Sequence, residues 1–231
     1  ISEIKAMIKY HNAAQNRCVT VKDYEDRIAM LPPKYGSPFR VSAIEENNKV
    51  KIFMLGLNSN GKLSTSFPEM FISNVMDYLS HYRTINDFVT IEPGEIIHLS
   101  FEANIFVDKN YNNGDVAYNV IQTIKNYMDI NNHRLGEDIF VGDIEKERSN
   151  IDGVLNLIDL KIYNKYKTLT ANPNYSSSKI AQMVESSGSE HVDGEDLILL
   201  SDTNYVLNSN VNSMFEINDP DNDIRVKMIA R

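Results

Sequence analysis

Residues 17 to 57 read RCVTVKDYEDRIAMLPPKYGSPFRVSAIEENNKVKIFMLGL, and this stretch decides how the first part of the chain folds. Thr20 is followed three residues later by Asp23, the spacing of a capping box, in which two side chains satisfy backbone N–H groups at a helix start. Apolar residues then recur at helical spacing as far as Leu31, where two prolines follow. The stretch therefore predicts a helix that begins after Thr20 and ends before Pro32.

The rest of the same stretch has the pattern of a β-hairpin. Apolar and polar residues alternate from Phe39 to Ala43 and again from Val50 to Met54, which is the period of a strand with one buried face. Asn47-Asn48 lies between the two runs, and asparagines suit a tight turn. We expect helix, turn, strand, hairpin and strand in that order.

This order carries a family resemblance. An arginine at 17, a threonine before the Lys-Asp-Tyr-Glu helix at 22–25, a proline turn and a Val-rich hairpin resemble the J-type baseplate proteins of contractile-tailed bacteriophages. The later order of elements follows that family to about Tyr166. The resemblance implies a structural subunit that forms a homodimer, contacts other baseplate wedge subunits around a central hub, and passes on conformational change rather than catalysing a reaction. It also implies a location in the virion, after assembly in the host bacterial cytoplasm.

Composition narrows the class of protein independently of the resemblance. The 231 residues are 42% hydrophobic, which suits a globular protein with a packed core. A net charge of −9 repels phosphate backbones and anionic membrane surfaces, so we expect no nucleic-acid partner and no membrane partner. No apolar run approaches the about 20 residues that span a bilayer. The opening at Ile1, without a methionine, suggests that an N-terminal part is missing.

Further elements are predicted along the chain. An opening helix is expected from Ser2 to Gln15. Ser66 and Glu69 have capping-box spacing ahead of a second helix, with Pro68 in its first turn. From Ile97 to Val107 apolar residues alternate without a break, so we expect one long strand whose other face, with His98, Ser100 and Glu102, is exposed to water.

A second module follows that strand. Asn112-Asn113-Gly114 leads into a helix, a short helix is expected near Asp143 to Ser149, and a strand runs from about Val154 to Tyr163 with a bulge at Leu157-Ile158. Strand, helix, helix, strand is typical of a crossover unit with a right-handed connection. We therefore expect an α+β fold of helix-on-sheet modules with mixed sheets, followed by a β-rich C-terminal segment.

The predicted boundaries are residues 1–86 for a helix-hairpin-helix module, 87–166 for the strand-helix-helix-strand module, and 167–231 for a β-rich interaction segment. The last segment has short apolar pieces between polar linkers, so its strands need a surface to cover them, on the same chain or on a partner. We expect self-association with this segment as a main contributor.

No stretch of the sequence has a complete metal-binding pattern. Asp219-Pro220-Asp221-Asn222-Asp223 resembles the start of a calcium loop, but Ile224 stands where glycine is needed and Ala230 where a bidentate glutamate is needed. We interpret it as a hairpin turn between two strands. The five histidines are scattered, and His98, His133 and His191 are not expected to form a zinc site.

Cys18 is the one cysteine, so no intrachain disulfide forms, and the chain fits a reducing cytoplasm. A catalytic thiol is the sharper interpretation of Cys18, and a small apolar residue ahead of a helix is the one that we favour. No phosphate-binding glycine loop or nucleophile elbow occurs. We predict no catalytic, cofactor-binding or metal-binding residues, no enzyme activity and no small-molecule substrate. The alternatives are a receptor- or glycan-binding tail module and, third, a hydrolase whose residues come from distant loops.

Overall fold

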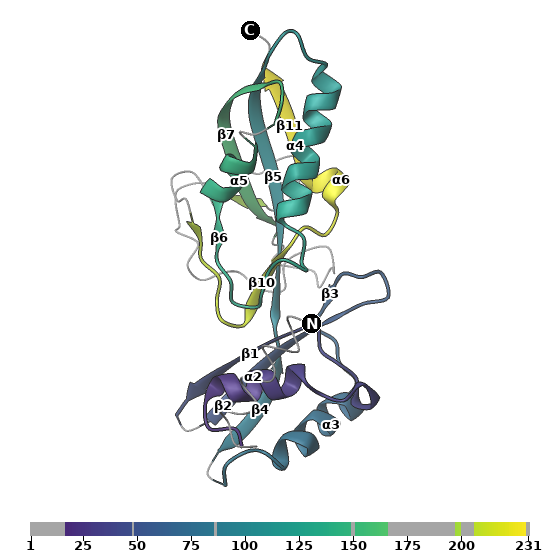
Figure 1. Cartoon of the computed structure of the whole chain (residues 1–231), viewed down its shortest axis with the longest axis vertical. Helices are drawn as coiled ribbons and strands as arrows, with labels where there is room; N and C mark the ends of the chain where they lie inside the picture. Colours follow the sequence, from purple (N-terminus) through teal and green to yellow (C-terminus); the bar gives the residue numbers. More distant parts are fainter. Residues whose placement is uncertain are drawn as a thin grey trace. The chain divides into compact units, whose positions relative to one another are not determined.

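The computed structural model describes residues 17–47, 49–85, 87–148, 151–165, 197–199 and 206–229. The chain divides into two compact units, residues 1–95 and 96–231, and in each of them helices pack on a mixed sheet (Figure 1). The α+β fold class with mixed sheets is therefore confirmed. The opening helix expected from Ser2 to Gln15 lies outside the described residues.

The first unit starts with helix α2, Val21–Ala29, and its N-terminus has the predicted capping box. Thr20 Oγ1 accepts the backbone N–H of Asp23 at 3.3 Å, and the Asp23 carboxylate accepts the backbone N–H of Thr20 at 2.7 Å. The helix buries Tyr24 and Ile28. A short 3-10 helix, η1 (Pro33–Tyr35), follows because proline cannot extend the α-helical hydrogen bonds.

The predicted hairpin is confirmed. Strands β1 (Arg40–Glu46) and β2 (Lys49–Leu57) pair antiparallel, with Glu46 opposite Lys49 beside the turn. Asn47 has a φ of 53°, in the left-handed region that asparagine tolerates better than most residues. The turn residue that the sequence pointed to is thus the one that adopts this conformation.

Two more strands and one helix complete the first unit. Strand β3 (Leu63–Ser64) is antiparallel to β2, and β4 (Phe88–Pro93) pairs parallel with β2. Helix α3, Glu69–Ser80, buries Val75 and Leu79 in the same core as α2 and the sheet. Arg27 of α2 lies over the ring of Tyr82, 4.3 Å from its centroid, and links α2 to the end of α3.

The start of α3 differs from the prediction. Pro68 is the N-cap residue, with no side-chain cap, and its carbonyl accepts the N–H groups of Phe71 and Ile72. Ser66 lies two residues before the N-cap and donates its N–H to Ser64 Oγ instead. The capping box of Ser66 and Glu69 is therefore wrong, because the helix begins two residues later than that motif requires.

The boundary between the units lies at Glu95, not at 86. Strand β4 follows residue 86 but pairs with β2 from Lys49 opposite Phe88 to Met54 opposite Pro93. Because that pairing is parallel and spans α3, local sequence gave no sign of it.

The second unit is built on strand β5 (Glu95–Val107). Helix α4 (Asn113–Tyr127) begins where Asn112 Oδ1 accepts the N–H of Gly114 at 3.0 Å, and it runs alongside β5 and the last strand (Figure 1). Strand β6 (Ile139–Phe140) and helix α5 (Val141–Arg148) follow. The predicted helical stripe is confirmed, since Val116, Val120 and Ile124 pack into a core with the apolar side of β5.

Strand β7 (Val154–Lys165) pairs with β5, and the predicted bulge is confirmed. Asp159 lies opposite Asn104 and Leu157 opposite Ile105, which leaves Ile158 without a partner in the ladder. The pairing is antiparallel, so the expected crossover unit with right-handed connection is wrong, since that rule governs parallel strands. The chain returns beside β5 in the opposite direction after its two helices.

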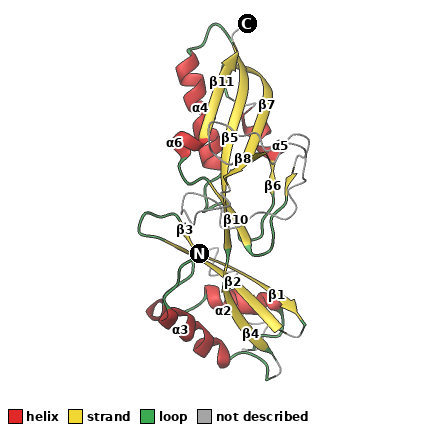
Figure 2. Cartoon of the chain, turned by 180° about the vertical axis from the view of Figure 1, so that it is seen from behind, coloured by secondary structure: helices red, strands yellow, loops and turns green. Residues whose placement is uncertain are grey.

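The last elements lie on the same unit. Strands β8 (Leu197–Leu199) and β9 (Val206–Leu207) pair with β7 and β6. Strand β10 (Ser213–Glu216), helix α6 (Pro220–Asp223) and strand β11 (Ile224–Ile229) follow. Both β10 and β11 pair with β5, and β11 is parallel to it. Figure 2 shows the sheet from the side opposite α4.

These contacts correct one expectation. The hairpin turn at 219–223 is wrong, because those residues form α6, with Pro220 at the helix start, between two strands that each pair with β5. The described strands at 206–229 pair with strands of their own chain, whereas residues 167–196 and 200–205 lie outside the described residues. No helix in the described ranges is long and apolar enough to cross a membrane.

Candidate functional site

Asp223 is the centre of a buried polar cluster in the second unit. Its Oδ1 accepts Lys165 Nζ at 2.6 Å, and its Oδ2 accepts the backbone N–H of Asp219 at 3.0 Å. Ser100 Oγ donates to the Asp223 carbonyl at 2.9 Å. The side chains of Asp223 and Lys165 are only 4% and 11% exposed, so this ion pair is shielded from water. The cluster joins α6 to both β5 and β7.

A second pair lies on the same face of β5. His98 Nδ1 is 3.6 Å from Glu216 Oε2, and both side chains are buried. The exposed face predicted for this strand is therefore wrong at His98 and Ser100, because Glu216 of β10 and Asp223 of α6 reach them there. Farther along, Glu102 Oε1 accepts Lys227 Nζ of β11 at 2.6 Å.

The residues of the rejected calcium loop have separate partners. Asp223 faces Lys165, whereas Asp221 Oδ1 accepts Lys125 Nζ at 2.6 Å on the surface. A cation at Asp223 has to displace a lysine ammonium. In the part of the chain that the structure describes, no three His, Cys, Asp or Glu side chains gather as a metal site. His133 lies 2.7 Å from the Tyr127 carbonyl, and His191 lies outside the described residues.

Cys18 is buried completely. Its backbone N–H donates to the Tyr82 carbonyl at 2.8 Å, and burial of the thiol raises its pKa from 9.0 to about 11. A nucleophilic cysteine needs a lowered pKa. The geometry fits the interpretation of Cys18 as a small apolar residue in the core.

The sheet of the first unit has two unlike edges. At the β1 edge, Glu25 Oε1 of α2 accepts the backbone N–H of Ala43 at 2.9 Å, so a helix side chain occupies the strand's outer hydrogen-bonding position. Strand β4 forms the other edge, and no described strand pairs with its outer side. An uncovered edge offers backbone groups to an added strand.

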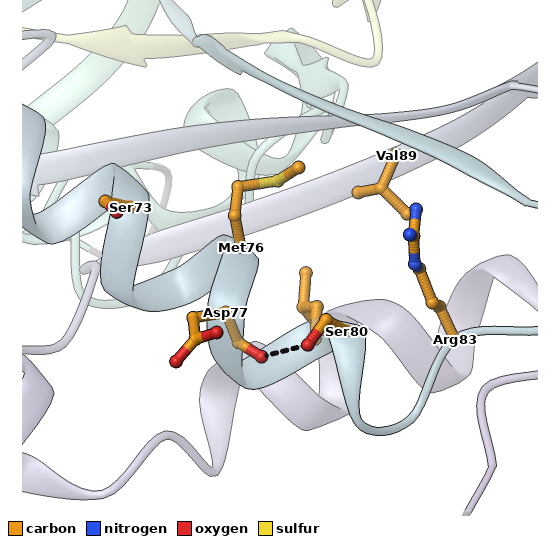
Figure 3. A pocket seen from close by; sticks show the side chains of 7 residues that line it. Ser73, Met76, Asp77, Ser80, Arg83 and Val89 are labelled. Atoms are coloured by element: carbon orange, nitrogen blue, oxygen red, sulfur yellow. Dashed lines mark hydrogen bonds between the residues drawn. The ribbon is translucent and has the colours of Figure 1, made fainter.

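A pocket of about 340 Å³ lies beside this open edge, between α3 and β4. Its apolar wall comes from Met76, Leu79 and Val89, and its rim carries Asp77 and Arg83 (Figure 3). Figure 3 shows the guanidinium end of Arg83 next to Val89. We call this pocket together with the outer side of β4 the β4 groove.

The start of the β4 groove is fixed by Asp87. The Tyr24 hydroxyl donates to Asp87 Oδ2 at 2.6 Å, and this hydrogen bond lowers the pKa of the Asp87 carboxyl. Burial raises the pKa of the Tyr24 hydroxyl, and its hydrogen bond to Asp87 raises it further. Arg83 Nη1 donates to the Asp87 carbonyl at 3.2 Å, which places a cation at the N-terminal end of β4.

The groove is suited to binding rather than to chemistry. A nucleophile activated by a base needs a hydrogen bond between the two, and Ser80 Oγ instead donates to the Asp77 backbone carbonyl at 2.6 Å (Figure 3). An open strand edge beside an apolar pocket is the arrangement in which proteins take up an extended segment, through main-chain hydrogen bonds and one inserted side chain.

A comparison of the whole fold with solved structures finds a neighbour. The chain is similar in fold to a chain of the anti-feeding prophage (AFP) baseplate. The superposition covers 90% of this chain, with a TM-score of 0.53 and 11% sequence identity. The matched part is 39% of the neighbour's length. No protein-family model matches the sequence. No curated protein sequence matches it either.

Sequence reasoning missed both sites for identifiable reasons. The buried cluster joins residues more than 100 positions apart, and a polar side chain on an alternating strand has the same pattern whether water or another strand covers it. The groove depends on β4 lying beside β2. The sequence does indicate that this strand is able to pair with another strand, because Phe88–Pro93 is rich in β-branched residues and contains no lysine or arginine. It does not indicate the pocket.

Proposed function

We propose that this chain is a structural subunit of a contractile-tail baseplate. The observation that carries the proposal is the fold likeness to a chain of the anti-feeding prophage baseplate over 90% of this chain. The resemblance of residues 17–166 to J-type baseplate proteins supports the same assignment from the sequence. One indication rests on residue patterns and the order of elements along the chain, and the other on how the helices and strands are arranged in space.

Within the baseplate we assign the chain to the wedge, as a counterpart of the ring-forming wedge protein of T-even phages. In that role it pairs with itself and with other wedge subunits around the central hub, and it passes on conformational change during contraction. Its place is the virion, after assembly in the host cytoplasm. A net charge of −9 supports protein partners over nucleic acid or an anionic membrane.

The proposed role is not catalytic. The buried charges around Asp223 are engaged with one another, and the thiol of Cys18 is enclosed and hard to ionise. Such pairs stabilise a fold or fix the register of its strands. A subunit that passes on force benefits from strands that are held at several points.

The test is incorporation into tails. The protein, carrying a tag, is supplied to cells in which its own gene is disrupted, and assembled tails are purified and imaged. We expect the tag in the baseplate region of the density map and no sheathed tails without the protein. Complete tails that lack the tagged protein would overturn the proposal.

A further inference from the structure

The β4 groove has features of an interface, and its chemistry points to one occupant. Of the edge strands longer than four residues in the described ranges, β1 is capped by Glu25, and β11 carries Arg225 and Lys227, which discourage pairing with another strand. Strand β4 reads Phe-Val-Thr-Ile-Glu-Pro and is neither capped nor positively charged. Of these three, β4 is the edge left open.

The sequence of β4 is complementary to itself in the antiparallel direction. With a two-fold axis at Thr90, Val89 stands opposite the partner's Ile91, and Phe88 stands opposite the partner's Glu92. No like charges then face each other, and pairs of β-branched residues are favourable across strands. Because Val89 lines the pocket, the partner's Ile91 closes it with an apolar side chain.

Charge complementarity favours the same arrangement. Arg83 lies at the N-terminal end of β4, through its bond to the Asp87 carbonyl, and Glu92 lies near the C-terminal end. Antiparallel pairing brings the Arg83 end of each copy beside the Glu92 end of the other, twice in one dimer, while the Asp87 carboxylate at that end accepts the Tyr24 hydroxyl of its own copy. Phe88, 66% exposed, is partly covered in the same step.

We propose that two copies of this chain pair through the outer edges of their β4 strands, antiparallel about Thr90, so that two four-stranded sheets become one continuous sheet. The inference rests on the self-pairing in the proposed function and gives that pairing a place. It places the contact in the first unit and not in the segment after Tyr166, whose described strands pair with β5, β6 and β7.

The first experiment measures the dissociation constant of the 231-residue chain by sedimentation at two salt concentrations. Thr90 is exposed, so Thr90→Lys leaves the core intact and sets two ammonium groups opposite each other at the axis. We expect roughly tenfold weaker pairing. Thr90→Val should keep the dimer. Asn119→Lys, an equal charge change on the exposed side of α4, should pair like the unaltered chain.

The second experiment tests the register and does not depend on how well Thr90→Lys folds. In the proposed dimer the two copies of residue 90 have Cα atoms about 5 Å apart, within the reach of a disulfide. The two copies of residue 92 are about 13 Å apart and cannot be bridged. Under mild oxidation Thr90→Cys should give a covalent dimer and Glu92→Cys should not, and Cys18 is too buried to interfere.

A monomeric chain at high micromolar concentration overturns the inference, as does equal cross-linking of the two cysteine variants or unchanged pairing of a folded Thr90→Lys chain. The proposed function fails separately. If Thr90→Cys cross-links but the protein is absent from tails, the β4 contact stands and the baseplate role is lost. If the protein is in tails and Thr90→Cys does not cross-link, only the β4 contact is lost.

Discussion

A buried carboxylate stabilises a fold only while its hydrogen-bond donors are present. The Asp223 carboxylate accepts hydrogen bonds from Lys165 Nζ and from the Asp219 N–H. In Asp223→Asn the buried ammonium of Lys165 loses the charged oxygen that lies 2.6 Å from it. We expect the free energy of unfolding to fall by about 3 kcal/mol. Urea unfolding followed by circular dichroism measures it as a lower midpoint at an unchanged slope.

Asp221→Asn is the matched control, two residues away on the same helix. Asp221 is 85% exposed, and its bond to Lys125 is a surface ion pair whose loss costs at most about 1 kcal/mol. If both variants lowered stability equally, the buried pair would not be the source of the effect.

Cys18 gives a prediction in alkaline solution. Its pKa rises from 9.0 to about 11 on folding, so the folded state favours the protonated thiol. The contribution to stability is complete below pH 9 and is lost as the pH rises toward 11. At pH 8 we expect iodoacetamide to leave the native chain unmodified and to label it fully in urea. Rapid labelling of the native chain at pH 8 would contradict the burial of this thiol.

At the scale of single residues, the sequence predicted what depends on near neighbours. The capping box of Thr20 and Asp23 and the turn at Asn47 involve contacts within four positions, so their pattern is complete in the local sequence. The burial of His98 depends on Glu216, far along the chain, and no local pattern encodes that contact. The predicted exposed face was wrong for this reason.

Among the elements, the β1 edge depends on one hydrogen bond from α2. In Glu25→Ala the N–H of Ala43 loses a charged acceptor, and we expect a loss of about 2 kcal/mol in the free energy of unfolding. The uncovered edge should also make the variant aggregate more readily on partial unfolding. Thermal unfolding with light scattering measures both effects.

Lys22→Ala is the control for that variant. Lys22 Nζ lies 2.9 Å from Glu25 Oε2 in an exposed ion pair, so its removal leaves the bond to Ala43 in place. We expect a change below about 1 kcal/mol and no added aggregation. A Lys22→Ala chain that aggregates like Glu25→Ala would assign the effect to the ion pair instead.

At this scale the existence of elements was predictable and their pairing was not. Helical stripes and alternation gave α2, α4, the hairpin and the bulge in β7, because each is set by spacing along the chain. The parallel pairings of β4 with β2 and of β11 with β5 join distant segments. The open edge of β4 follows from such a pairing and was not foreseen.

For the whole molecule, the division into residues 1–95 and 96–231 predicts separate local stability. Asp223→Asn should speed amide hydrogen exchange in β5, β7 and β11 and leave β1 and β2 unchanged. Glu25→Ala should speed amide hydrogen exchange in β1 and β2 and leave β5, β7 and β11 unchanged. Hydrogen exchange with mass spectrometry resolves the two units, and faster exchange throughout both units in either variant would show that they unfold together.

The position of β11 at the end of the chain also delays completion of the sheet around β5 during synthesis. Ser100 and Asp223 are 123 residues apart in the sequence, yet β11 and α6 close the edge and the buried pairs of β5. At synthesis rates of about 5 to 20 residues per second, the nascent chain waits roughly 6 to 25 seconds after β5 leaves the ribosome before β11 exists. During that time the edge of β5 that later pairs with β11 stays open to other strands, even after β7 has paired with the opposite edge, so slow translation across this interval raises the demand for chaperones.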